Sequence, residues 1–210
     1  MRAVIVAAGP VEDIPSLTPF IEENTVVIAV DGGVATLVQQ GLAFDLAIGD
    51  FDSLGYTPEG AVIHPAEKDE TDLELALRHV SEQYEVTDVL IFGATGGRLD
   101  MTLQNVYLLK QFPAARLVTK REEVRFLQEG HDQIKADQYH YLSFIPLVPT
   151  RLTLRGVKYP LTDHDVPVGG SLTVSNEWTD HQLADVTVHT GEVIVLRSLS
   201  DVELPPPTLR

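Results

Sequence analysis

Residues 88–100 read DVLIFGATGGRLD, and this stretch decides the class of fold. Residues 88–92 form a short run of mostly apolar, branched side chains, which is typical of a strand covered by helices on both faces. Glycines then interrupt the run, and a helical pattern follows from residue 99. A strand that passes through a glycine-rich turn into a helix is the repeating unit of an α/β sheet.

The same pattern recurs through the first 120 residues. Further apolar runs predict strands at 3–8, 26–30, 46–48, 61–63 and 115–118. Helical stripes lie between them: one consists of Leu73, Ala76, Leu77 and Val80, the other of Leu99, Leu103, Val106 and Leu109. Strands that alternate with helices predict a mostly parallel, three-layer α/β domain.

The pattern changes after about residue 121. Strand-like segments follow one another without a convincing helix, punctuated by glycine and proline; they span 123–128, 139–145, 151–155, 171–174, 184–189 and 192–197. Short strands with frequent turns predict a small β-sandwich. The polar stretch 130–137 suggests the boundary, so we expect an α/β domain at 1–130 and a β-sandwich at 131–210.

The composition excludes several classes of function. The chain has 210 residues and no cysteine, which excludes disulfides, iron–sulfur clusters, thiolate zinc sites and cysteine nucleophiles. Its net charge of −16 disfavours binding to nucleic acid or anionic membranes, and a polyphosphate ligand would need accompanying cations. The N-terminal apolar run is too short for a membrane span, so we expect a first strand and a cytoplasmic protein.

A pair of carboxylates, Asp50 and Asp52, follows the predicted strand that ends at Ile48. In extended geometry the two side chains would point to the same side, at the sheet edge where α/β proteins bind ligands. Two oxygen ligands suit Mg²⁺, which also takes phosphate oxygens. The alternative is an Asx-turn, in which one carboxylate binds local amide groups.

A second polar cluster begins the clearest helix, at residues 68–74. Thr71 and Glu74 match a capping box, which explains both without any function. Lys68 could instead meet a phosphate, and Asp72 could complete a metal site with the first carboxylate pair.

The glycine-rich turn at 93–97 and Arg98 form a third cluster. Amide groups at a helix N-terminus bind anions, and an arginine can bind a phosphoryl group with two hydrogen bonds. The turn matches neither a Walker A loop nor a dinucleotide-binding loop, and a tight turn with a surface arginine is the alternative. Asp31-Gly32-Gly33 follows another predicted strand, so four strand ends with Asp or Gly are expected on one sheet edge.

In order and spacing, these motifs resemble the thiamine diphosphokinase (thiamine pyrophosphokinase) family. The matching residues are Asp31-Gly32-Gly33, Gly49-Asp50-Phe51-Asp52-Ser53, Lys68-Asp69-x-Thr71-Asp72-x-Glu74-x-Ala76-Leu77, Gly96-Gly97-Arg98-x-Asp100, Gly156-Val157-Lys158-Tyr159-Pro160-Leu161 and Ser175-Asn176-Glu177. The resemblance covers nearly the whole chain. It implies a homodimer with sites between subunits and a transfer of the pyrophosphoryl group of ATP to thiamine.

The resemblance also implies roles for individual residues. Asp50, Asp52 and Asp72 would hold Mg²⁺, and Ser175 and Asn176 would bind the thiamine pyrimidine. The nucleotide would be bound by Asp31, Gly32, Lys68, Thr71, Gly96, Gly97, Arg98 and Asp100. Trp178 either stacks on an aromatic ring of the substrate or packs at the sandwich edge. Met101 departs from the family, which usually has histidine or another polar residue there.

The expected reaction is an in-line attack of the primary hydroxyl of thiamine on the β-phosphorus of ATP, giving thiamine diphosphate and AMP. Such transfers depend on positioning and charge neutralisation, with Arg98 stabilising the transferred or departing group and Asp72 as the candidate base. Two alternatives remain. The acceptor could be another hydroxymethyl heterocycle, such as a pterin alcohol, or the protein could be a non-catalytic nucleotide or thiamine sensor.

Overall fold

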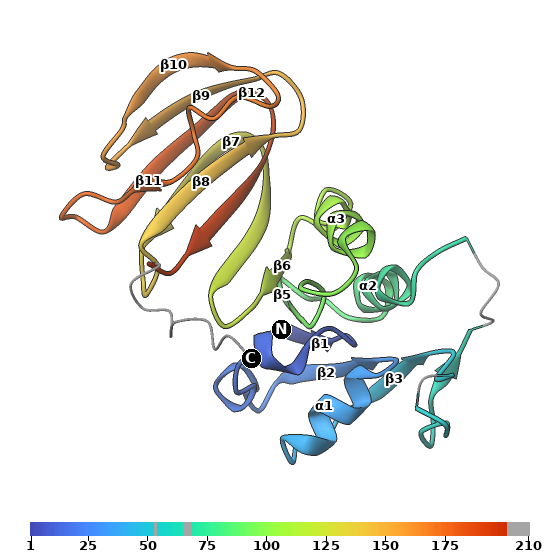
Figure 1. Ribbon diagram of the computed structural model, residues 1–210. Coiled ribbons are helices and arrows are strands. Elements are labelled where there is room, and N and C mark those ends of the chain that lie inside the picture. The colour runs from blue at the N-terminus through green and yellow to red at the C-terminus, as the bar shows by residue number, and fades with distance from the viewer. Residues whose placement is uncertain (53, 65–68, 201–210) are drawn as a thin grey trace, which may run out of the picture. The chain divides into compact units, whose positions relative to one another are not determined.

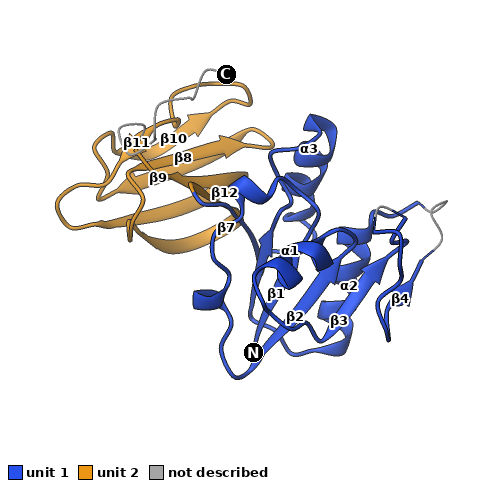
Figure 2. Cartoon of the chain, turned by 60° about the horizontal axis from the view of Figure 1, so that its bottom comes forward, with its two compact units in different colours: residues 1–120 blue, residues 121–210 orange. Residues whose placement is uncertain are grey.

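The computed structural model describes residues 1–52, 54–64 and 69–200. Two compact units make up the chain, residues 1–120 and residues 121–210 (Figure 2). The sequence placed the domain boundary at 130/131, inside the polar stretch 130–137, most of which belongs to a long strand, β7 (Glu122–Lys135). Lys68, Ser53 and the C-terminal residues 201–210 lie outside the described residues.

Unit 1 contains one parallel sheet. Its strands are β1 (Arg2–Val6), β2 (Thr25–Val30), β3 (Leu46–Gly49), β4 (Val62–Ile63), β5 (Asp88–Phe92) and β6 (Ala115–Val118). Their order is β6-β5-β1-β2-β3-β4, and every pair is parallel. The chain therefore proceeds outward from β1 in one direction and then returns to its other side with β5. This reversal is the point at which open α/β sheets form a ligand crevice.

Helices cover both faces of this sheet. α1 (Gly33–Gln39) lies on one face, and α2 (Asp72–Gln83) and α3 (Leu99–Leu108) lie on the other (Figure 1). Two 3-10 turns, η1 (Val11–Asp13) and η2 (Thr18–Phe20), lie between β1 and β2. Val4 and Val6 belong to the core cluster that contains Leu37 of α1. Ala3 and Ile5, which alternate with them along β1, are also fully buried. The three-layer α/β arrangement predicted from unbroken apolar runs is confirmed.

The two predicted helical stripes have different outcomes. On α2, Leu73, Ala76, Leu77 and Val80 are all buried, as predicted. On α3, Leu99 and Leu103 are 71% and 52% exposed, so the stripe was wrong for these two residues, whereas Leu109 just after the helix is fully buried as predicted. The buried residues of α3 itself are Asn105 and Leu108, which lie on a different face from Leu99 and Leu103.

Unit 2 is antiparallel and β-rich. Besides β7 it has β8 (Tyr141–Pro146), β9 (Thr150–Arg155), β10 (Leu161–Val166), β11 (Asn176–Glu177) and β12 (Leu183–Ser198). β12 pairs with β7 along its length, with β9 through its first half and with β8 through its second half. An irregularity between Val188 and Glu192 separates the two halves of β12. This one strand therefore contributes to both layers of the unit. Side chains from both halves share one core with β8 and β9, which confirms the predicted sandwich.

One strand prediction in this unit was wrong. Residues 171–174 form turns, and the strands nearest to them are β10 and the short β11. β10 was not predicted from the sequence, because four of its six residues, LTDHDV, are polar. An exposed strand of this kind lacks the apolar alternation that is typical of a half-buried strand.

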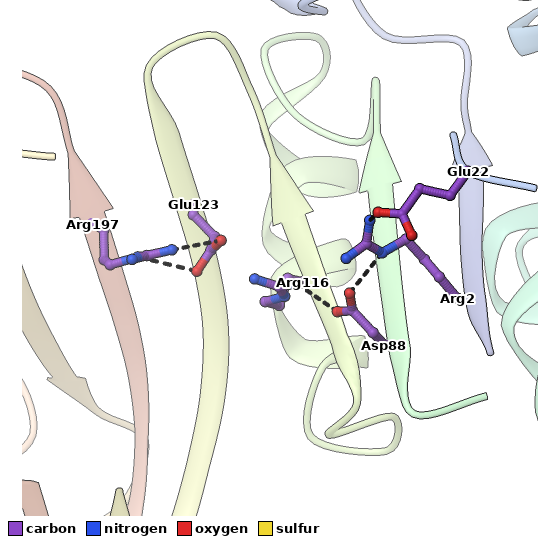
Figure 3. A network of polar contacts seen from close by, with 6 residues as sticks. All are labelled: Arg2, Glu22, Asp88, Arg116, Glu123 and Arg197. Atoms are coloured by element: carbon purple, nitrogen blue, oxygen red, sulfur yellow. Dashed lines mark hydrogen bonds and ion pairs between the residues drawn. The ribbon is translucent and has the colours of Figure 1, made fainter. Parts of the chain in front are cut away.

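Each unit has its own ion-pair network (Figure 3). In unit 1, Asp88 at the start of β5 accepts hydrogen bonds from Arg2 Nε at 2.9 Å and from Arg116, and Arg2 also pairs with Glu22. In unit 2, Arg197 binds Glu123 at 2.9 Å, with both side chains buried. The unit 1 network joins the amino ends of β1 and β5, opposite the sheet edge where a ligand crevice is expected.

Candidate active site

A cavity of about 510 Å³ lies at the carboxyl ends of the unit 1 strands. Its walls come from the segments that follow β1, β2, β3 and β5 and from the first turns of α2 and α3. The β1 and β5 segments meet closely, since the Gly9 amide donates to the Gly93 carbonyl at 2.7 Å. The cavity therefore occupies the crevice that the strand order predicts.

Asp31 organises the edge where β2 and β3 end. Its Oδ1 accepts hydrogen bonds from the amides of Asp50 at 3.2 Å and Phe51 at 3.3 Å. Gly49 makes this approach possible, because a Cβ at that position would lie 2.0 Å from Asp31 Oδ1. The Asp31 carboxylate thus fixes the backbone that carries Asp50.

Four carboxyl residues line the cavity: Asp31, Asp50, Glu70 and Asp72. Burial, followed by the charge and a hydrogen bond of the nearby Asp72 carboxyl, raises the pKa of Asp31 to about 6. The Phe51 amide lowers this pKa and the charge of Asp50 raises it slightly, so the influences that disfavour the ionised form outweigh the one that favours it. The site holds negative charge that a bound cation would stabilise.

Asp52 does not line this cavity. Phe51 has a φ of 57°, so the chain is left-handed between the two carboxylates, and the expected extended geometry was wrong. Phe51 turns its ring into the core, and Asp52 is exposed with its amide donating to Asp50 Oδ1 at 3.1 Å. The Asx-turn that the sequence left as an alternative is therefore present at Asp50.

The start of α2 combines capping with a place in the cavity wall. Thr71 is the N-cap, and its Oγ accepts from the Glu74 amide at 3.2 Å, as the capping box predicts. Thr71, Asp72 and Glu70 all line the cavity. Glu70 pairs with Arg78 at 3.0 Å, and Glu74 pairs with the same arginine.

The glycine-rich turn leads into α3, whose N-cap is Arg98. Gly97 and Arg98 line the cavity, whereas Gly96 packs against Asp13 and Gly32 caps α1 outside the cavity wall. Arg98 is exposed and binds Asp100 through Nε at 3.2 Å and a terminal nitrogen at 2.6 Å. These hydrogen bonds raise the pKa of Arg98 and lower that of Asp100, so the guanidinium is held beside the cavity as a cation.

Sequence reasoning did not assign Asn105 to the site, although this polar residue lines the cavity. It lies on α3 one turn after Met101, and both residues line the cavity with Thr102 between them. A usable signal was present, since an asparagine inside a predicted apolar helix needs a polar partner or a ligand.

The residues expected to bind thiamine lie in unit 2. Ser175 has a φ of 56°, its amide donates to Ser143 Oγ at 2.9 Å, and it lines a hollow of about 290 Å³ with Tyr141. Asn176 is 2% exposed, and its amide group bonds both the N–H and the C=O of Tyr159. Trp178 donates to the Ile134 carbonyl at 2.9 Å and packs on the sandwich core, which is the packing alternative.

Two family models match the chain. "Thiamin pyrophosphokinase, catalytic domain" matches residues 17–120, and "Thiamin pyrophosphokinase, vitamin B1 binding domain" matches residues 131–195. The chain belongs to the thiamine pyrophosphokinase family. The resemblance seen in the sequence motifs is thereby confirmed, and all residues that line the cavity except Ala7, Ala8 and Gly9 lie within the part matched by the catalytic domain of thiamine pyrophosphokinase.

Individual relatives agree with this assignment. A thiamine pyrophosphokinase of Bacillus subtilis is 37% identical over 209 residues, which covers 92% of this chain and 97% of the relative. Solved thiamine pyrophosphokinase structures from Bacillus subtilis and Geobacillus thermodenitrificans superpose with TM-scores of 0.87 at 35% and 33% identity. They cover 95% and 97% of this chain, and all of each solved chain is matched.

Proposed function

We propose that the cavity of unit 1 binds ATP together with Mg²⁺, and that Asp50, Asp72 and Arg98 perform the transfer there. The chain is an enzyme, a thiamine diphosphokinase, that transfers the pyrophosphoryl group of ATP to thiamine. One observation carries the assignment of this activity to the cavity. Four carboxyl residues, a glycine-rich turn at a helix N-terminus and an arginine line a single cavity at the sheet's topological switch point.

The donor set of the cavity fits magnesium. The acids present only oxygen donors, and a divalent cation nearby would favour the ionised form of Asp31, which burial and then the charge of Asp72 disfavour. We assign the cation to one or two carboxylates, Asp50 and Asp72, with phosphate oxygens completing its coordination. Asp52 as a third ligand stays a prediction.

In the reaction, the hydroxyl oxygen of thiamine forms a bond to the β-phosphorus, and the bond from that phosphorus to the oxygen bridging to the α-phosphate breaks. AMP leaves with that oxygen, and the hydroxyl proton passes to Asp72 or to solvent. Arg98 and the amides at the start of α3 bind phosphoryl oxygens and position the β-phosphorus for attack. Bound magnesium would supply neutralisation of phosphate charge.

Thiamine is favoured as the acceptor over a pterin alcohol, since residues 131–195 match a vitamin B1 binding domain. The catalytic match lies in unit 1, whereas the vitamin-binding match lies in unit 2. We therefore retain the prediction that Ser175 and Asn176 serve the acceptor, with Asn176 shaping the turn at Tyr159.

We also propose a cytoplasmic homodimer. Support for association is an exposed apolar face on α3, formed by Leu99, Leu103 and Tyr107, each more than half exposed. In the described part of the chain, no helix is both long and apolar enough to span a membrane. Cell fractionation tests the location.

The function is tested by assaying AMP formation by the wild type and by Asp50→Asn and Asp72→Asn variants. Both variants should lose most turnover while keeping their thermal unfolding transition, and excess Mg²⁺ should not restore it. Glu82→Gln, an exposed acid on α2, is the matched control and should remain active. Near-normal turnover by both aspartate variants would contradict the assignment.

Replacing thiamine by a pterin alcohol tests the acceptor, and nucleotide binding without AMP release would indicate a sensor.

A further inference from the structure

Asn105 is a buried polar residue that the proposed reaction does not use. It is 7% exposed, lies on α3 and lines the cavity of unit 1. Its side-chain nitrogen donates to the Ala94 carbonyl at 2.7 Å. Because a carbonyl only accepts hydrogen bonds, this contact fixes which end of the amide is nitrogen.

The other end of that amide has no partner. Asn105 Oδ1 is fully buried and lacks a hydrogen bond among the described residues. A buried acceptor without a donor is costly, and native proteins normally satisfy such atoms. An orphaned oxygen in the wall of a ligand cavity indicates a ligand that brings a hydrogen-bond donor.

The part of ATP that meets Asn105 follows from chemistry. Phosphate oxygens are acceptors, so they cannot satisfy Oδ1, whereas the donors that suit phosphates, Gly97 and Arg98, lie at the start of α3. Asn105 is seven residues beyond Arg98, which is about 10 Å along a helix. The cavity lining also includes Ala7, Ala94 and Met101, whose apolar side chains suit the flat face of a base.

We propose that Asn105 is a specificity-determining residue of the nucleotide site, whose Oδ1 accepts a hydrogen bond from the nucleoside part of ATP. The donor is either the exocyclic amino group of adenine or a ribose hydroxyl. The inference rests on the proposed binding of ATP in this cavity. Thiamine is a less suitable source, because most of the cavity lining falls within the catalytic match and none of it within residues 131–195.

Four nucleotides distinguish the two donors. At saturating thiamine, kcat/KM is measured for ATP, ITP, 2′-deoxy-ATP and 3′-deoxy-ATP. ITP replaces the amino donor with a carbonyl acceptor, and each deoxynucleotide removes one hydroxyl. The wild type should prefer ATP by about 10-fold or more over the analogue that lacks the relevant donor. Equal use of all four would overturn the inference without any variant.

The variant Asn105→Leu keeps the approximate size but cannot accept a hydrogen bond. Its preference for ATP over that one analogue should fall to within about two-fold, with the other ratios unchanged. A purely structural role would lower kcat/KM for all four nucleotides by the same factor, leaving every ratio intact, and this result would also overturn the inference. Gln104→Leu, an exposed amide on the same helix, is the matched control and should keep wild-type ratios.

The assay distinguishes a failure of this inference from a failure of the proposed function. If the wild type forms no AMP from ATP and thiamine, the proposed function fails and the inference with it. If turnover with ATP is normal but Asn105→Leu retains every ratio, only the role of Asn105 is wrong.

Discussion

The carboxyl groups of Asp31 and Asp72 are hydrogen-bonded to each other, although one ends β2 and the other begins α2. Together with burial, this pairing raises the pKa of Asp31 to about 6. Burial and the neighbouring Asp72 carboxyl both disfavour the ionised form of Asp31, so Asp31 keeps its proton to a higher pH than an ordinary aspartate. Holding these carboxyl groups close together thus lowers the stability of the ligand-free protein, and a bound cation would reduce that loss.

The first prediction concerns Asp31→Asn in the ligand-free protein. The folded-state pKa of about 6 lies above the ordinary value of 3.8, so the wild type loses stability as the pH rises from 3.8 to 6. Asparagine does not titrate and keeps an oxygen for the amides of Asp50 and Phe51. The variant's melting temperature should therefore exceed that of the wild type above pH 6, with the difference vanishing near pH 3.8, while activity falls.

Asp100→Asn is the control for this experiment, because the pKa of Asp100 is lowered whereas that of Asp31 is raised. Arg98 lowers the pKa of Asp100, so its ionised form stabilises the fold at neutral pH and its loss should give no gain in melting temperature. The Asp31 prediction is wrong if Asp31→Asn melts below the wild type at pH 7.5, or if its gain is the same at every pH.

A second prediction follows from the close approach of Gly49 to Asp31. Gly49→Ala places a Cβ 2.0 Å from Asp31 Oδ1, so either the strand end or the carboxylate must move. The free energy of unfolding, measured with urea, should fall by about 2 kcal/mol, and activity should fall with it. Gly97→Ala is the control, since nothing lies near its Cβ, and its stability should change little. Equal stabilities for the two variants would show that β3 adapts freely.

The third prediction concerns the geometry of Arg98. Arg98→Lys keeps the charge but loses the planar pair of donors, so kcat should fall about 100-fold. Melting temperature should hardly change, because the Arg98–Asp100 pair is 76% and 65% exposed. Arg78→Lys on α2, outside the cavity wall, is the matched control. A kcat for Arg98→Lys within two-fold of wild type would exclude a two-point contact with phosphate.

The fold was largely readable from the sequence because unbroken apolar runs such as 88–92 require helices on both faces. The residues of the cavity were readable where the end of a strand or the start of a helix fixes them, as at Asp31, Asp50 and Asp72. Asp52 was misplaced since nothing in the sequence signals the left-handed Phe51, whose ring is drawn into the core. Leu99 and Leu103 were misplaced because periodicity identifies a helical stripe without showing which face the tertiary structure covers.

The fourth prediction uses that misplaced stripe. If the exposed face of α3 forms the homodimer contact, Leu103→Glu should convert the dimer to a monomer in analytical ultracentrifugation, because a buried charge would have no partner there. Val38→Glu on α1, where the side chain is 60% exposed, is the control and should leave the dimer intact. A monomeric wild type, or a dimeric Leu103→Glu protein, would count against this interface.

The last prediction concerns the buried ion pair of unit 2. Arg197 binds both oxygens of Glu123, donates to the Lys135 carbonyl at 2.7 Å and lies over the Tyr139 ring at 4.6 Å. Burial alone would lower the pKa of Arg197, but the charge and hydrogen bonds of Glu123 outweigh it, so the guanidinium stays charged.

Arg197→Met should therefore cost about 3–5 kcal/mol in urea denaturation, because Glu123 stays buried without its two-point partner. The double variant Arg197→Met with Glu123→Leu should recover most of that loss, since an apolar pair has no charge to desolvate. Asp137, the other acid bound to Arg197, is 57% exposed, so water should solvate its carboxylate when Arg197 is replaced. If the double variant is as unstable as the single one, the loss comes from the contacts with Lys135 and Tyr139 and not from the stranded charge.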